Sequence, residues 1–207
     1  MASMLLGSHP SQTRRALVRA SESRPYATDQ QASSNDSFVR ALLVDNLRVR
    51  LDSTITLLGV QKHLGSTEIH EAQHHDDHTW TCYRVAIDSG PAVYLRLESD
   101  EIGGPDHRIM GFDLGKEPPG DVAASACAST RARSIRTDNG LAIGISIHEL
   151  LAVMGTPKAI VNGKYEFAYS RSVTPAVGVP YDIDATLKVE TKAGRVTRLS
   201  GWYSETT

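Results

Sequence analysis

Residues 70–78 read HEAQHHDDH, and the first five letters fit the H-E-x-x-H pattern of many zinc metalloproteases. In that pattern two histidines one helical turn apart bind the zinc, and the glutamate serves as general base. The hypothesis that follows is a zinc-dependent hydrolase in which His70 and His74 bind the metal and Glu71 acts on the attacking water.

The residues around this stretch argue against a metal site. Zinc ligands of this kind lie on a helix that packs firmly against the rest of the protein. Residues 67–78 contain Ile69 and Ala72 as their only aliphatic side chains, so a helix there would have no apolar face to bury. We therefore expect a polar loop, with Ile69 in a short leading strand, and neither a resident metal nor another cofactor.

No other stretch assembles a catalytic set. Residues 144–148, GISIH, lack the final glycine of the G-x-S-x-G nucleophile elbow. The chain has neither a phosphate-binding loop nor a G-x-G-x-x-G fingerprint. Ser146 is better placed to cap a helix than to attack a substrate. We therefore expect a protein that is not an enzyme.

Charge and length narrow the class further. The 207 residues contain 22 Lys and Arg against 24 Asp and Glu, a formal net charge of -2. Without a basic field, binding to nucleic acid is not expected. No apolar run approaches the roughly 20 residues that cross a bilayer, so we expect no transmembrane segment. Residues 1–36 are rich in Arg, Ser and Gln and poor in large apolar side chains, which predicts a disordered tail.

The two cysteines bear on the compartment. Cys82 lies in a strand-like run, TWTCYRV, and Cys127 lies in a segment of small residues, VAASACAST. A bond between them would stabilise the fold by about 4 kcal/mol through loop closure. We expect this disulfide and, with it, a periplasmic or secreted protein, because disulfides persist in oxidising compartments. Two unpaired thiols would favour the alternative, a cytoplasmic protein.

Two segments of the chain follow the same pattern. Residues 51–67, LDSTITLLGVQKHLGST, align with residues 141–157, LAIGISIHELLAVMGTP. Thr56 and Ser146 are suited to cap helix N-termini, and Ser146 forms a capping box with Glu149 three residues later. Apolar residues then recur at helical spacing, which predicts two short helices with one apolar face each. Glycines are expected to end these helices, at Gly65 and Gly155.

After each helix the apolar residues alternate, which predicts antiparallel strands. The expected strands cover residues 79–85, 92–97 and 108–114, and then 165–169, 185–190 and 196–202. The pattern predicts an α+β fold of two tandem helix-plus-antiparallel-meander repeats, with the helices packed on one face of the sheet. The expected divisions are a tail at 1–36, repeat unit 1 at 37–115, a linker at 116–138 and repeat unit 2 at 139–207.

Each of these units resembles the BamE (SmpA/OmlA) family. The resemblance rests on a capped short helix with an L-G-x-P-like end, LGST or MGTP, and on a closing strand of the form K-x-G-R-V-x-x-L, here KAGRVTRL. Two such units in tandem look like the β-lactamase inhibitor protein architecture. Members of these families are exported and bind other proteins, and the tandem form offers a curved sheet as the binding face. The chain departs from them in having neither a lipobox cysteine near its first residue nor one disulfide per unit.

The side of the sheet away from the helices is the expected binding surface. By strand parity five aromatic and arginine residues project from it, and such side chains are enriched in binding hot spots. These interface candidates are Trp80, Tyr94, Arg96, Arg198 and Trp202. We therefore expect an exported, non-enzymatic module that binds another protein. The zinc-dependent hydrolase and a structural envelope protein without specific activity are the alternatives.

Overall fold

The computed structural model describes residues 38–71, 78–88, 90–99, 106, 108–120 and 122–207. These residues belong to one compact unit, Ser33–Thr207. The predicted tail, residues 1–36, lies outside the described residues, as does most of the HEAQHHDDH stretch.

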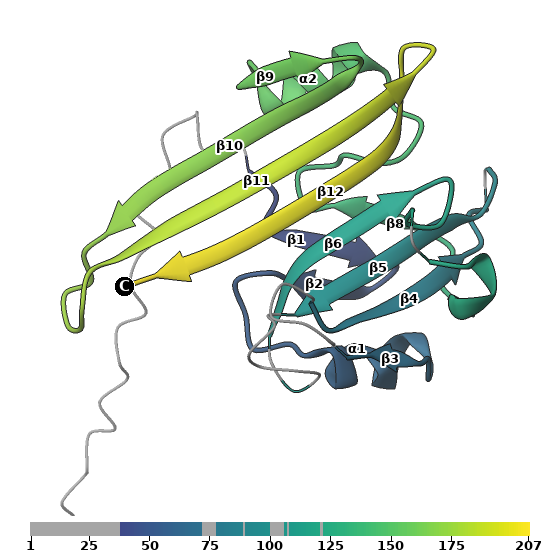
Figure 1. Cartoon of the computed structure of the whole chain (residues 1–207), viewed down its shortest axis with the longest axis horizontal. Coiled ribbons are helices and arrows are strands. Elements are labelled where there is room, and N and C mark those ends of the chain that lie inside the picture. Colours follow the sequence, from purple (N-terminus) through teal and green to yellow (C-terminus); the bar gives the residue numbers. More distant parts are fainter. Residues whose placement is uncertain (1–37, 72–77, 89, 100–105, 107, 121) are drawn as a thin grey trace, which may run out of the picture. The chain divides into compact units, whose positions relative to one another are not determined.

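A nine-stranded sheet dominates this unit (Figure 1). Along the sheet the strands run in the order β3 (Ile69–His70), β4 (Trp80–Val85), β5 (Val93–Ser99), β6 (Ile109–Gly115), β12 (Arg195–Thr206), β11 (Tyr181–Lys192), β10 (Lys164–Val173) and β9 (Ala159–Val161). Each neighbouring pair in this order is antiparallel. The ninth strand, β7 (Ala128–Ser129), pairs in parallel with β4.

A smaller sheet joins segments that are distant in sequence. Its order is β2 (Leu47–Arg50), β1 (Ala41–Val44) and β8 (Ile135–Thr137). The Asp45 carboxylate accepts hydrogen bonds from the backbone N–H groups of Arg133 at 3.0 Å and Ser134 at 2.8 Å. This carboxylate ties the β1–β2 turn to the segment before β8, because both amides donate to it.

Two helices of eight residues begin and end at the residues that the sequence predicts. The Thr56 side chain accepts from the third amide of α1 (Leu57–Leu64), and α1 ends at Gly65. Ser146 forms a complete capping box with Glu149 at the start of α2 (Ile147–Met154). Gly65 and Gly155 have φ of 104° and 74°, a backbone region that favours glycine. The predicted caps and helix ends are therefore confirmed.

The main core lies on one side of the nine-stranded sheet. In β4, β5 and β6 and in parts of β11 and β12, alternate residues point to this side and are almost fully buried, as in the β5 pair Leu95 and Leu97. α1 packs against β5 and α2 against β12. The helices contribute buried apolar side chains to the same core, namely Leu57, Val60, Leu64, Leu150 and Met154.

The predicted α+β fold class is wrong. We expected two tandem helix-plus-meander repeats, and the structure is a β-rich fold, mostly antiparallel sheet, with two short helices among the described residues. One reason is strand length, because β11 and β12 each run for 12 residues where alternation predicted six or seven. The second is that β6 pairs with β12 and merges the strands into one sheet. Residues 116–138, predicted as a linker, contribute β7, β8 and the 3-10 helix η2 (Ala124–Ala126).

Candidate functional site

All five predicted interface residues lie on the side of the main sheet opposite the core, which we call the outer face. Residues directly opposite each other in neighbouring strands share a face. Strand pairing gives three such rows: Trp80, Glu98, Gly111 and Trp202; then Cys82, Arg96, Asp113 and Ser200; then Arg84, Tyr94, Gly115 and Arg198. The five interface candidates are each partly buried. Their shared face follows from the strand order and was predicted from strand parity.

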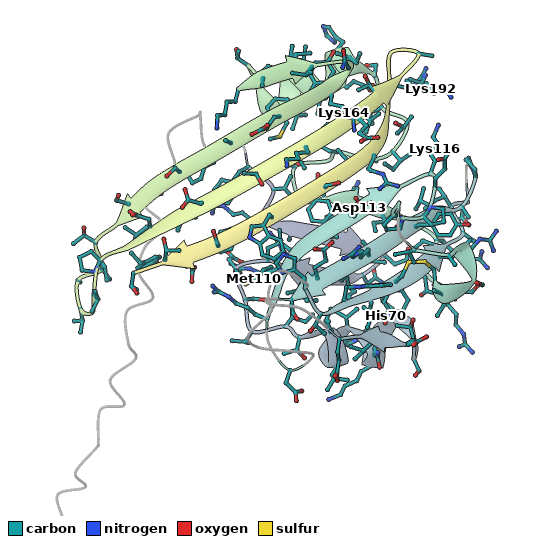
Figure 2. All side chains as sticks on the ribbon, in the orientation of Figure 1. His70, Met110, Asp113, Lys116, Lys164 and Lys192 are labelled. Carbon is teal, nitrogen blue, oxygen red and sulfur yellow. A yellow bond between two sulfur atoms is a disulfide. The ribbon has the colours of Figure 1, made fainter. Side chains whose placement is uncertain are left out.

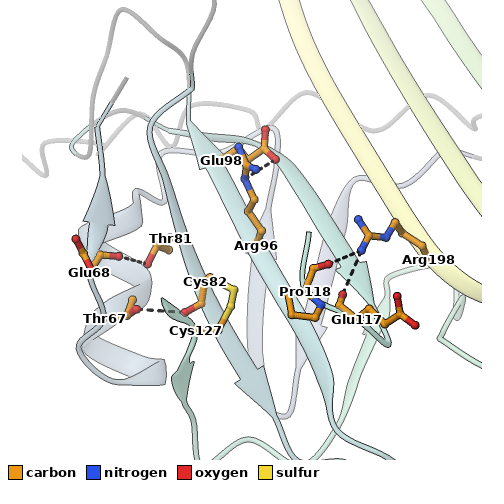
Figure 3. The surroundings of a disulfide bond; sticks show 10 residues. All are labelled: Thr67, Glu68, Thr81, Cys82, Arg96, Glu98, Glu117, Pro118, Cys127 and Arg198. Carbon is orange, nitrogen blue, oxygen red and sulfur yellow. Dashed lines mark hydrogen bonds and ion pairs between the residues drawn. A yellow bond between two sulfur atoms is a disulfide. The ribbon is translucent and has the colours of Figure 1, made fainter. Parts of the chain in front are cut away.

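A disulfide covers one part of the outer face. Cys82 on β4 is bonded to Cys127, 45 residues later, so the predicted disulfide is confirmed (Figure 3). The two half-cystines form a small second core with Val122. Trp80 and Tyr94 pack against this cluster. Tyr94 therefore holds the segment around Val122 on the sheet in addition to lying on the outer face.

Trp80 is the centre of a stacked group at the edge of the outer face. The His70 ring stacks on it with centroids 3.7 Å apart and an angle of 13°. The Arg96 guanidinium lies 4.7 Å from the indole centroid, within the range of a cation–π contact, and its Nε is 3.1 Å from a Glu98 carboxylate oxygen. The His70 ring, the Arg96 guanidinium and the Glu98 carboxylate therefore surround the Trp80 indole.

Two glycines of β6 receive the other predicted side chains. A methyl group on Gly111 would overlap the Trp202 indole, so that ring packs directly on the β6 backbone. A methyl group on Gly115 would come within 3.2 Å of the Arg198 guanidinium. The sequence signal for this arrangement is GFDLG at residues 111–115, because glycine inside a strand marks a close approach by another group.

Asp113 lies between these two glycines, and sequence reasoning missed it. One carboxylate oxygen, Oδ2, accepts from the Ser200 hydroxyl at 2.8 Å and from Arg198 at 3.3 Å. The other oxygen, Oδ1, has no hydrogen-bond partner among the described residues, although the side chain is only 15% exposed. Burial raises the pKa of Asp113 above its ordinary value, although the Ser200 hydrogen bond and Arg198 act in the opposite direction.

Arg198 also connects the outer face to a basic groove. Its guanidinium donates to the backbone carbonyls of Glu117 at 3.1 Å and Pro118 at 2.8 Å (Figure 3). Five cationic side chains and two carboxylates line this groove: Lys116, Lys164, Lys192, Arg195 and Arg198, with Glu117 and Glu190. Lys116, Lys164 and Lys192 are labelled in Figure 2 toward the same end of the sheet. Lys164 is paired with Glu190 at 2.7 Å and Arg198 with Asp113 at 3.3 Å, so the charge that favours an anionic group in the groove comes from Lys116, Lys192 and Arg195.

Glu71 is described and exposed, and of the two histidines of the HEAQH hypothesis only His70 is described. His70 ends strand β3 opposite Trp80, whereas the ligands of a zinc protease share a helix. Ile69 occupies the leading strand predicted for it. His74 lies outside the described residues, so the complete ligand set is not placed. Within the described ranges no three His, Cys, Asp or Glu side chains form a group that could hold a metal ion.

The chain matches no protein-family model, no curated protein and no solved structure. The resemblance to the BamE and β-lactamase inhibitor protein families therefore stays a prediction. No helix in the described part of the chain is long and apolar enough to cross a membrane.

Proposed function

We propose that this chain is an exported, non-enzymatic module that binds another protein through its outer face. The observation that carries the proposal is Asp113, whose mostly buried carboxylate has one oxygen without a hydrogen-bond donor among the described residues. A buried acceptor left unpaired costs about 1–3 kcal/mol, and a partner whose docking brings a donor to this oxygen recovers part of that cost. Asp113 lies in the row beside both tryptophans, and such aromatic residues are frequent anchors of interfaces.

Preorganisation of the face supports the same proposal. His70 and Glu98 hold Trp80 and Arg96 in place, and Gly111 lets the Trp202 ring lie flat on the sheet. Side chains that are ordered before binding lose less conformational entropy when a partner docks. The face is therefore suited to binding a rigid protein surface.

The partner surface is expected to carry acidic side chains beside a hydrogen-bond donor. The donor would meet Asp113, and the acidic groups would meet the basic groove that begins at Arg198. Opposite charges on the two surfaces accelerate association and favour one orientation. Binding should therefore weaken as the salt concentration rises.

The disulfide supports the proposed location. Disulfides of this kind are typical of proteins in oxidising compartments and rare in the cytosol. Cys82 and Cys127 are bonded and both buried. On this basis we propose that the chain works in the periplasm or outside the cell.

Site-specific photocrosslinking tests the proposal in the full chain. A photoreactive amino acid at Ser200 probes the outer face, and the same group at Lys62, exposed on α1, is the control. We expect one dominant adduct from Ser200 and none from Lys62. Equal adducts from both positions, or none from Ser200, would contradict the proposal.

Titration with the purified adduct protein then gives the energetic test. Trp202→Ala should weaken binding about 30-fold or more, as truncation of a central aromatic anchor does. Lys62→Ala should leave the affinity unchanged. Zinc content after dialysis provides a separate check, because one tightly held zinc per chain would favour the hydrolase hypothesis.

A further inference from the structure

Among the described residues, one edge of the main sheet is open along part of β10. β10 runs from Lys164 to Val173, and β9 pairs with Lys164–Glu166. Along residues 167–173 the outer edge of β10 has no strand partner among the described residues (Figure 1). An unpaired strand edge presents backbone donors and acceptors that can pair with another strand.

The direction of these backbone groups follows from one hydrogen bond. The Lys158 N–H donates to the Glu166 carbonyl at 2.7 Å, so the backbone groups of Glu166 point away from β11. In an antiparallel strand this direction alternates residue by residue. The N–H and C=O groups that face the open edge are therefore those of Ala168, Ser170 and Ser172.

Exposed apolar side chains lie at both ends of this edge. Ile160 and Val161 of β9 are 58% and 62% exposed. Val177 and Val179, in the turn that follows β10, are 92% and 70% exposed. Among the described residues only Leu58 is a further exposed large apolar side chain. The open backbone and the exposed apolar groups thus share one border of the sheet.

We propose that a second copy of this chain pairs with this edge, antiparallel, about a two-fold axis at Ser170. Residues 167–173 are limited on one side by the contact of β9 with Glu166 and on the other by the end of β10 at Val173. The midpoint of this stretch is Ser170, whose backbone groups face the edge. A two-fold antiparallel pair requires that arrangement at its centre, because the two central residues exchange both hydrogen bonds.

The sequence of the open edge complements itself in this register. Residues 167–173 read FAYSRSV. Phe167 would lie opposite Val173, and Ala168 opposite Ser172. Arg171, the one charged residue of the seven, would face Tyr169 and not its own copy. A register shifted to centre on Arg171 would set two like charges against each other.

The same register accounts for the exposed valines and isoleucine. In an antiparallel pair, the turn after β10 in one copy emerges beside β9 of the other copy. Val177 and Val179 would therefore approach Ile160 and Val161 at both ends of the pairing. About six backbone hydrogen bonds and two apolar contacts would close an edge that is otherwise open.

Sedimentation equilibrium of the full chain tests the pairing. We expect a monomer–dimer equilibrium from micromolar to near-millimolar protein. Ser170→Pro removes an N–H that faces outward, a change that edge strands tolerate, and should weaken dimerisation about 100-fold. Ser170→Ala keeps the backbone donor and should dimerise like the wild type. Ser170→Glu, which sets two carboxylates face to face, replaces the proline variant if that variant fails to fold.

Cysteine scanning tests the register. With Cys82 and Cys127 bonded to each other, a new cysteine is the one free thiol. Two Ser170→Cys chains would meet at the axis with Cα atoms about 5.5 Å apart, within disulfide range. They should cross-link faster than Ser172→Cys chains, whose cysteines face Ala168. A chain that stays monomeric, a dimer that Ser170→Pro leaves intact, or equal cross-linking by the two cysteine variants would overturn the proposal. The pairing is independent of the proposed function, because it uses the edge and not the outer face.

Discussion

At one edge of the main sheet two short strands cover β4, whereas at the other edge β9 covers only the first three residues of β10. β3 pairs with Trp80 and Thr81, and β7 pairs with Tyr83 and Arg84, so cover extends along β4. These two strands come from segments about 60 residues apart in the chain, and the Cys82–Cys127 bond fixes the later one. The β10 edge has no such covalent fastening.

One edge is closed by strands of the same chain, and the other is the edge at which we propose pairing with a second copy. Closure of the β4 edge uses strands that are far apart in the sequence. The disulfide restricts the long chain segment that leads to β7. At β10 the unpaired backbone is bordered by exposed apolar side chains. We infer that the two edges have different tasks, one in stability and the other in association.

The largest effect is expected from removing the disulfide. The double variant Cys82→Ala and Cys127→Ala should lower the free energy of unfolding by about 4 kcal/mol, because the bond restricts a long loop in the unfolded chain. Urea unfolding of the variant and of the oxidised wild type measures the difference. A loss well below 1 kcal/mol would show that the pairing of β7 with β4 does not depend on the disulfide.

A smaller effect is expected at the β6–β12 junction, midway between the edges. A methyl group on Gly201 would overlap the Phe112 ring, so Gly201→Ala should destabilise the fold by about 1–3 kcal/mol. Gly120→Ala is the control, because no atom lies within 4 Å of its new methyl group. Thermal unfolding of both variants tests the contact. Equal stability of the two would mean that the junction can open to admit the methyl group.

The caps of α1, which packs against β5, and of α2, which packs against β12, should contribute similarly to stability. Thr56→Ala and Ser146→Ala each remove a side-chain acceptor from a helix N-terminus, at a cost of about 1 kcal/mol. Chemical denaturation of the two single variants gives the comparison. Similar losses would show that the contrast between the β4 edge and the β10 edge lies in the edge strands. A much larger loss at one cap would show that the contrast also involves the helices.

The smallest effect concerns Asp113 and depends on pH. Because burial raises its pKa in the folded state, the folded chain holds the proton more tightly than the unfolded chain does. Binding of this proton by Asp113 adds to the free energy of unfolding. That contribution is fully present below the unfolded-state pKa and is lost as the pH rises through the folded-state pKa. Asp113→Asn, which cannot ionise, should be slightly more stable than the wild type at neutral pH and lose that advantage in acid. The free energies of unfolding of Asp113→Asn and of the wild type at neutral and at acid pH test this prediction. A variant that is less stable than the wild type at neutral pH would show that the Arg198 ion pair outweighs the cost of burial.

Local signals in the sequence predicted local structure well. Thr56, Ser146 and Glu149 act within one helical turn, so the sequence alone could place both caps. The outer face followed from strand alternation. Pairing between strands distant in sequence could not be predicted, because the periodicity within β6 does not say that β12 is its neighbour. Asp113 was missed for a related reason, since its contacts with Ser200 and Arg198 depend on that pairing.

The pairing of β6 with β12 has a consequence for the order in which the sheet can be completed. β6 ends at Gly115, and its partner strand β12 begins at Arg195, 80 positions later. During synthesis, a chain that has been made only as far as residue 194 leaves β6 as a second exposed edge. Such a partial chain is expected to aggregate or to require a chaperone. The C-terminal strand therefore acts as the closing element of the whole sheet.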